Sequence, residues 1–140
     1  MNAAQLLDRL DRVKQTAPGR WLARCPAHED RAPSLSIREL DDGRVLLNDF
    51  GGCSTADVLA ALGLAMSDLF PQRLNGHSYA PSHTRIAPRD LLLIVSEEVT
   101  LVGIIAADIL ERRTISEADW KRLAQAAGRI GRARDHVHGS

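Results

Sequence analysis

The sequence predicts an α+β protein, in which a small β-hairpin module with flanking helices is followed by a C-terminal α-helical hairpin. Three observations predict this class. Within residues 34–48, polar and apolar residues alternate on either side of a turn, as in the strands of a half-buried hairpin. A stretch rich in proline and polar residues, 71–87, then interrupts the pattern. After it, residues 91–110 are nearly continuously apolar and long enough for a buried helix.

Composition narrows the function classes. The 140 residues carry 18 basic and 18 acidic side chains, so the chain has no excess positive field to attract polyanions. At 140 residues, the chain is also short for a metabolic enzyme with a deep cofactor pocket. The N-terminus lacks the apolar run of a signal peptide, and Glu97, Glu98 and Asp108 interrupt 91–110. We therefore expect a cytoplasmic protein that does not enter a membrane.

The first elements follow from periodicity and turn residues. Leu6, Leu7, Leu10 and Val13 share one face of a helix, which Pro18–Gly19 would end. Residues 21–24 are expected to be extended. Residues 34–38 and 44–48 form the predicted hairpin around a turn at 41–43.

Later elements are predicted from capping residues. Ser54, with Asp57 three residues on, begins a short helix through Leu62, and Gly63 follows it. Pro88 suits the first turn of the long apolar helix. Ser116 begins a last helix that runs toward residue 134. The expected organisation is a module over 1–70, a linker over 71–87, a helical hairpin over 88–135 and a disordered tail over 136–140.

Two short motifs flank the hairpin and carry metal-ligand chemistry. Cys25 and His28 are separated by two residues, and Asp49 and Cys53 by three, around a Gly-Gly pair. The hairpin between them would bring the two pairs together. Two cysteines also allow one disulfide, but in a reducing compartment metal ligation is the better interpretation. Two thiolates and an imidazole suit zinc better than magnesium or calcium.

This pattern resembles a known family. Cys-Pro-x-His, the step into Arg-x-Pro-Ser-Leu-Ser, the hairpin and Gly-Cys-Ser-Thr before a helix are similar to the Cys-His-Cys-Cys zinc-binding domain of bacterial and phage DNA primases. The likeness covers residues 21–64 and is strongest to the small forms encoded by prophages and other mobile genetic elements. Asp49 stands where the family has a cysteine. In that family the zinc ribbon contacts the single-stranded template and helps the catalytic domain choose where to begin.

The resemblance implies a zinc-finger protein of mobile-element or phage DNA replication. Because nothing after Leu64 resembles a primase catalytic core, we expect a non-catalytic, DNA primase-like accessory protein and not an enzyme. The partners implied are single-stranded DNA and a primase catalytic subunit or helicase. We also expect helix 90–112, apolar on all sides, to pack against a partner or a second copy.

Alternatives remain open at this point. Asp49 either completes a mixed zinc site, or the site has decayed and the two cysteines are buried apolar residues. A decayed ribbon would suit a protein-interaction adaptor that has lost DNA binding. An open metal position beside Asp49 and His28 would suit a small metal-dependent hydrolase.

Candidate nucleic-acid contacts combine arginines with aromatic side chains, the combination that single-strand binding uses. Trp21 and Phe50 are the candidate stacking surfaces. The last helix carries a run of basic residues, which Arg132 and Arg134 continue. Alternatively, these arginines pair with neighbouring acids and the aromatic rings are core. The candidates are Arg20, Trp21, Arg24, Arg31, Arg38, Arg44, Lys121, Arg122 and Arg129.

Overall fold

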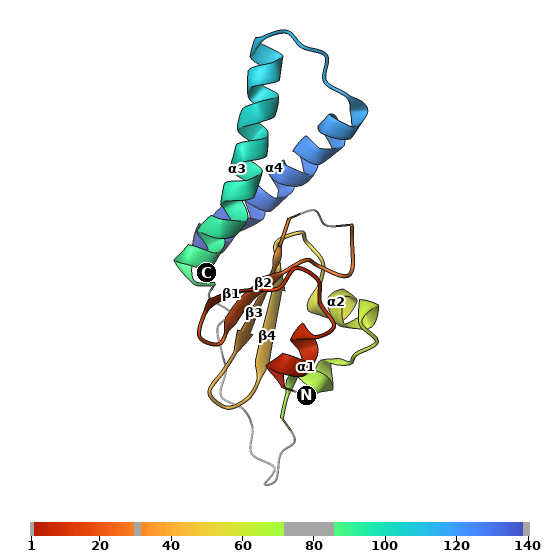
Figure 1. Cartoon of the computed structure of the whole chain (residues 1–140), viewed down its shortest axis with the longest axis vertical. Helices are drawn as coiled ribbons and strands as arrows, with labels where there is room; N and C mark the ends of the chain where they lie inside the picture. Colours follow the sequence, from red (N-terminus) through yellow and green to blue (C-terminus); the bar gives the residue numbers. More distant parts are fainter. Residues whose placement is uncertain (1, 30–31, 72–85, 139–140) are drawn as a thin grey trace.

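The computed structural model describes residues 2–29, 32–71 and 86–138. Within them lies a four-stranded antiparallel sheet in the order β1-β2-β3-β4, so each strand pairs with the next along the chain. A C-terminal helical hairpin leans against the sheet and projects beyond it (Figure 1). The elements are α1 (Ala3–Leu7), β1 (Lys14–Ala17), β2 (Arg20–Ala23), β3 (Leu35–Glu39), β4 (Val45–Asp49), α2 (Thr55–Ala61), the 3-10 helix η1 (Met66–Leu69), α3 (Pro88–Leu110) and α4 (Glu117–His138).

One face of the sheet forms the main core. Leu35 and Ile37 of β3 are fully buried there, and Leu47 of β4 lies opposite Ile37. Leu6 of α1 and Leu59 of α2 close over them, because each short helix offers one apolar face. The α+β class is therefore confirmed.

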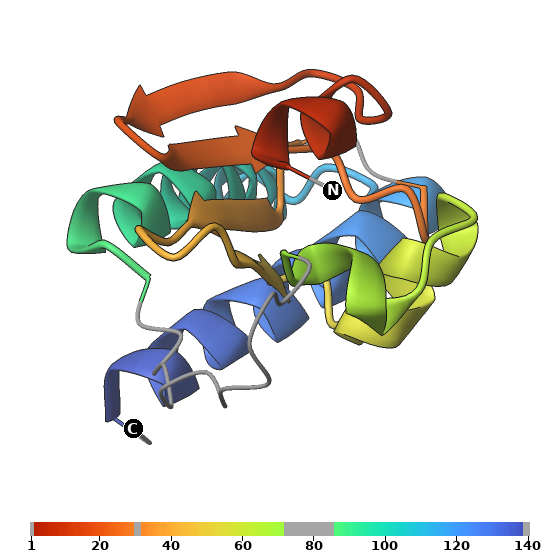
Figure 2. The ribbon, with the colours of Figure 1, turned by 90° about the horizontal axis from the view of Figure 1, so that it is seen from below.

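The opposite face of the sheet packs against the helical hairpin. Leu22 of β2 and Phe50, just after β4, meet Ile94 of α3 and Ala133 of α4 in a second, smaller core. The hairpin therefore crosses the face of the sheet away from α1 and α2 (Figures 1 and 2). In the described part of the chain, no helix is both long enough and apolar enough to cross a membrane.

The turn and capping predictions are confirmed at two places. Gly43 adopts φ of 88° in the β3–β4 turn, a conformation that glycine reaches without strain. The Ser54 side chain accepts a hydrogen bond from the Asp57 backbone N–H at the start of α2.

Two element boundaries differ from the expectation. The first helix ends at Leu7, because residues 14–17 pair with β2 as strand β1 instead of continuing the helical pattern. The last helix runs to His138, so residues 136–138 are helical and not a tail. His136 is held in place, since its Nε2 accepts a hydrogen bond from the Ile86 backbone N–H at 3.1 Å. Of the expected linker, residues 72–85 lie outside the described residues.

Candidate metal centre

The two predicted ligand pairs lie at the ends of neighbouring segments of the sheet. Cys25 and His28 follow β2, in the turn that leads toward β3. Asp49 is the last residue of β4, and Cys53 immediately precedes Ser54, the N-cap of α2. Because β2 and β4 flank β3, the antiparallel register brings the two pairs to one end of the sheet.

The four side chains are positioned to bind one metal ion. One ligand atom from each of Cys25, His28, Asp49 and Cys53 lies within 4.8 Å of the other three. His28 Nδ1 lies 3.1 Å from Cys53 Sγ and 3.7 Å from Asp49 Oδ2. Both cysteines are free thiols. A set of two sulfurs, one imidazole nitrogen and one carboxylate oxygen is compatible with zinc.

The Asp49 carboxylate is buried and held in one orientation by hydrogen bonds. Its side chain is 0% exposed. The Ser34 hydroxyl donates to Oδ1 at 2.7 Å, and the Gly51 N–H donates to the same oxygen at 3.1 Å. The Cys53 N–H donates to Oδ2 at 3.1 Å. These bonds satisfy the carboxylate and hold it toward the two thiols, as the outer contacts of a metal ligand do.

The Gly-Gly pair makes room for this arrangement. A Cβ at Gly51 would collide with the His28 imidazole and would lie 2.9 Å from Asp49 Oδ2. Gly52 adopts φ of 97°, and a Cβ there would lie 3.1 Å from the guanidinium carbon of Arg132. A side chain at Gly51 is therefore excluded by His28, whereas at Gly52 the positive φ is what favours glycine.

The environment of the thiols favours their protonated form. The pKa of Cys25 is raised to about 12, chiefly by burial, against a lowering hydrogen bond with the Ala27 backbone and with a smaller raising contribution from the negative charge of Asp49. Burial and Asp49 likewise raise the pKa of Cys53. A bound cation would reverse this preference, because metal ligation needs the thiolate.

Beyond the four ligands, the site continues into the helical hairpin. Arg129 Nη2 lies 3.3 Å from His28 Nε2, the imidazole nitrogen that faces away from Cys53. Arg129 is 1% exposed and donates to Glu98 Oε1 of α3 at 2.7 Å. Arg122 donates to both oxygens of Glu98, at 2.7 and 3.1 Å. This chain of contacts connects the candidate ligand His28 to both helices of the hairpin.

A second link joins α4 to the other ligand pair. Arg132 Nε donates to the Phe50 carbonyl at 2.8 Å, next to the Gly-Gly turn. The Phe50 ring meets the His136 ring edge to face, with centroids 5.9 Å apart. Sequence reasoning named Ser34 and Glu98 for no role at the site, since a serine and a glutamate carry no distinguishing local signal. Their contacts with Asp49 and Arg129 become visible only in the three-dimensional structure.

The predicted nucleic-acid contacts do not form one surface. Arg20 and Arg38 lie opposite each other on β2 and β3, on the face that packs against the hairpin. Arg44, 9% exposed, pairs with Asp42 at 2.8 Å. Lys121 is exposed on α4, whereas Arg122 and Arg129 point to Glu98. Arg129 is therefore buried in an ion pair and, in this conformation, is not available to a phosphate.

The remaining candidates are placed as follows. Trp21 is half-buried against the main core, on the face opposite Arg20. Phe50 is 2% exposed and belongs to the second core, so it offers no stacking surface. Arg24 is half-buried beside Cys25, and Arg31 lies outside the described residues.

Comparison with known proteins adds no assignment. No protein-family model, no curated protein and no solved structure matches this chain. The functional argument therefore depends on the geometry of the site and on the motif resemblance.

Proposed function

We propose that this chain is a zinc-dependent, non-catalytic module that binds single-stranded DNA. It would act beside a primase catalytic subunit or a helicase during replication of phage or other mobile DNA. The observation that carries the proposal is the convergence of Cys25, His28, Asp49 and Cys53 on one point. The resemblance of their spacing to primase zinc-binding domains supplies the DNA and replication parts.

The geometry supports a structural role for the ion. All four residues would be ligands, and both oxygens of buried Asp49 already accept hydrogen bonds. Zinc in such a closed site contributes to folding, by about 10–16 kcal/mol in small zinc peptides. Here it would join the end of β2 to the start of α2, and through His28 it would bear on α4. These features favour the structural role over the hydrolytic one.

A salt titration tests the DNA part of the proposal. Binding of a fluorescently labelled oligothymidylate to the zinc-loaded protein should weaken with salt, because phosphate contacts release counterions. For single strands, log affinity falls with log salt with a slope of about −0.7 per phosphate contact. Cys25→Ser should lose zinc and binding together. Absence of oligonucleotide binding by zinc-loaded protein at low salt would contradict the proposal.

A second function is favoured by a specific feature of α3. Several of its large apolar side chains are exposed to solvent, and such a surface is typical of a protein-interaction site. An adaptor would bind its protein partner with little salt dependence and without oligonucleotide. Sedimentation over a range of concentrations tests whether a second copy is that partner. The residues are Leu92, Val99, Ile104, Ile109 and Leu110.

A further inference from the structure

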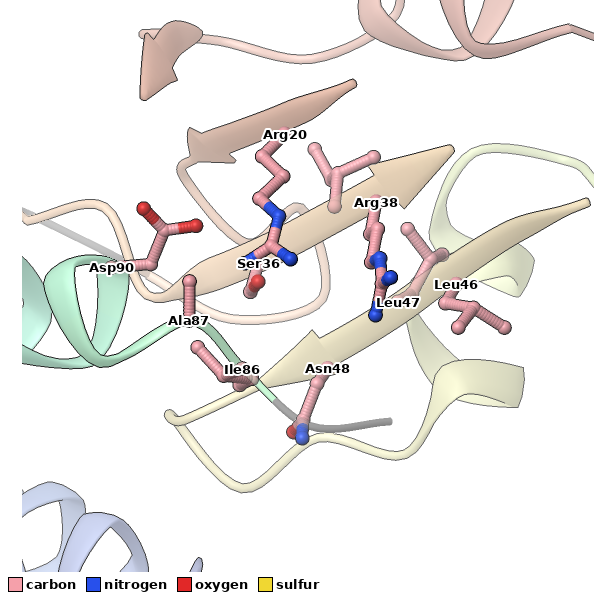
Figure 3. Close-up of a pocket in the computed structure, with 10 residues that line it drawn as sticks. Arg20, Ser36, Arg38, Leu46, Leu47, Asn48, Ile86, Ala87 and Asp90 are labelled. Carbon is pink, nitrogen blue, oxygen red and sulfur yellow. The ribbon is translucent and has the colours of Figure 1, made fainter. Parts of the chain in front are cut away.

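In the described part of the chain, helix α3 is packed on one side only. Its buried side chains Ile94, Glu98 and Ile105 recur at helical spacing along one face. Ile94 packs with the sheet and with α4, and Glu98 pairs with α4. At the start of the helix, Ala87 and Asp90 lie against the sheet, and the cavity between them and the strands has a volume of only about 20 Å³ (Figure 3). That is little more than one water molecule needs, so this face of α3 is closed to ligands.

A largely apolar stripe on another face of α3, here called the seam, is exposed along the helix. Its positions follow one another at alternating intervals of four and three residues, which is the spacing at which two helices pack together. Leu92 and Leu110, at the two ends, are 73% and 84% exposed, and Val99 near the middle is 54% exposed. The seam consists of Leu92, Ser96, Val99, Gly103, Ala106 and Leu110.

A groove beside one end of the seam is lined almost entirely by apolar side chains. It lies between the start of α3 and the end of α4, is open to solvent and has a volume of about 250 Å³. Arg134 is the one polar residue in its lining. An apolar side chain fits such a groove, because filling it removes apolar surface from water. The apolar lining is made by Leu91, Leu92 and Val95 of α3 and by Ile130, Ala133 and Val137 of α4.

The chain carries a side chain that suits this groove, but at the other end of the same helix. Leu110 is the most exposed large apolar side chain in the described part of the chain. It lies about 27 Å from Leu92 along the helix axis, so it cannot reach the groove of its own chain. The seam positions are symmetric about residue 101, so two antiparallel copies of α3 bring Leu92 of each copy opposite Leu110 of the other. At the centre, Val99 of each copy lies opposite Gly103 of the other.

Electrostatics favour the antiparallel arrangement over the parallel one. A parallel pair would place two positive helix N-termini side by side and add the like charges of two exposed Arg89 side chains. In the antiparallel pair, each positive end meets the negative C-terminal end of the other helix. The charged side chains at that end balance one another, and they are Asp108, Glu111, Arg112 and Arg113.

We propose that a second copy of the chain covers this face, and that two α3 helices pair antiparallel about a twofold axis near residue 101. Leu110 of each copy lies in the groove of the other, so a closed dimer fills both grooves at once. Because the hairpin projects beyond the sheet, this pairing places the two sheets at opposite ends of the paired helices (Figure 1). Pairing through the seam involves no DNA contact and so goes beyond the proposed function.

Sedimentation velocity of the zinc-loaded full chain, from about 1 µM to about 1 mM, measures the equilibrium between monomer and dimer. Leu110→Lys replaces the side chain that fills the groove. Ile104→Lys is the matched control, because Ile104 is also a large apolar residue of α3, 58% exposed, but lies outside the seam. Circular dichroism verifies that both variants are folded.

We expect wild type and Ile104→Lys to form dimers with similar dissociation constants. Leu110→Lys should raise the dissociation constant roughly a hundredfold or more, because each dimer loses two buried leucines. A wild type that stays monomeric over the whole concentration range would overturn the inference, and a different protein would then be the partner of this face. Equal weakening by the two variants would also overturn it.

Disulfide cross-linking tests the orientation. Leu92→Cys and Leu110→Cys are treated with oxidised glutathione, each alone and as a mixture, and wild type treated in the same way measures any background from the native cysteines. In the antiparallel pair the two introduced thiols meet only in a mixed dimer, whereas in each variant alone they are about 27 Å apart. We expect cross-linked dimer in the mixture only. Absence of cross-linking in the mixture, or equal cross-linking in each variant alone, would refute the antiparallel pairing.

Discussion

Glu98→Gln removes a negative charge of α3 that pairs with two arginines of α4. Glu98 is 1% exposed and accepts hydrogen bonds of 2.7 and 3.1 Å from Arg122 and 2.7 Å from Arg129. Glutamine keeps the shape but removes the negative charge that pairs with the buried Arg129 guanidinium. Removing one partner of a buried ion pair costs about 3–5 kcal/mol. We expect the free energy of unfolding to fall by that amount.

The assay is urea unfolding at fixed free zinc, followed by circular dichroism. Glu97→Gln is the matched control, because Glu97 is the exposed neighbour on the same helix and its loss should change stability by less than about 0.5 kcal/mol. A loss below about 1 kcal/mol for Glu98→Gln would refute the reasoning, since the triad would then not hold the hairpin together.

The pH dependence gives the same prediction a second readout. Burial raises the pKa of Glu98, but the hydrogen bonds and charges of Arg122 and Arg129 outweigh burial, so the pKa is lowered from 4.5. The stabilisation by Glu98 is therefore complete above pH 4.5 and is lost as the pH falls through the lowered folded-state pKa. The stability difference between wild type and Glu98→Gln should be largest near neutral pH and should shrink in acid.

Three further predictions concern the metal centre. Asp49→Cys should bind zinc more tightly than wild type in a chelator competition, because a thiolate is a softer ligand than a carboxylate. Weaker binding by the variant would contradict this, and would show that the hydrogen bonds to Asp49 contribute more to zinc affinity than the softness of the ligand atom. Gly51→Ala should destabilise the protein by about 1–3 kcal/mol and weaken zinc binding, whereas Gly103→Ala in α3, where a Cβ meets nothing within 4 Å, should be neutral or stabilising by up to about 1 kcal/mol. Zinc binding at pH 7 should release about two protons, because the raised pKa values of Cys25, about 12, and of Cys53 keep both thiols protonated until the metal binds. Calorimetry in buffers of different ionisation enthalpy measures this number. Binding without proton release would contradict thiolate ligation.

Local signals predict most of the fold. Alternation predicts β3 and β4, and capping residues predict α2 and the start of α4. The leucine spacing at the N-terminus predicts too long a helix, since Val13 fits a helical face but lies next to a strand that pairs with β2. Strand pairing is a tertiary effect, and a helical period in a short segment does not reveal it.

The four candidate ligands are also predictable, because a short metal-ligand spacing is a local signal. Their supporting contacts are not. Arg129 and His28 are separated by 101 residues, and Glu98 and Arg129 by 31. The basic run on α4 suggests an exposed surface, yet Glu98 holds Arg122 and Arg129. Likewise, the register of β2 and β3 is needed to place Arg20 beside Arg38.

The metal content of the purified chain tests the central claim most directly. Elemental analysis of wild type, Cys25→Ser and Asp49→Ala, with circular dichroism on each, measures both the ion and the fold. The account predicts one zinc per chain in wild type, none in Cys25→Ser and a reduced amount in Asp49→Ala after mild chelation. A fully folded wild type without bound metal, which also fails to take up added zinc, would contradict it.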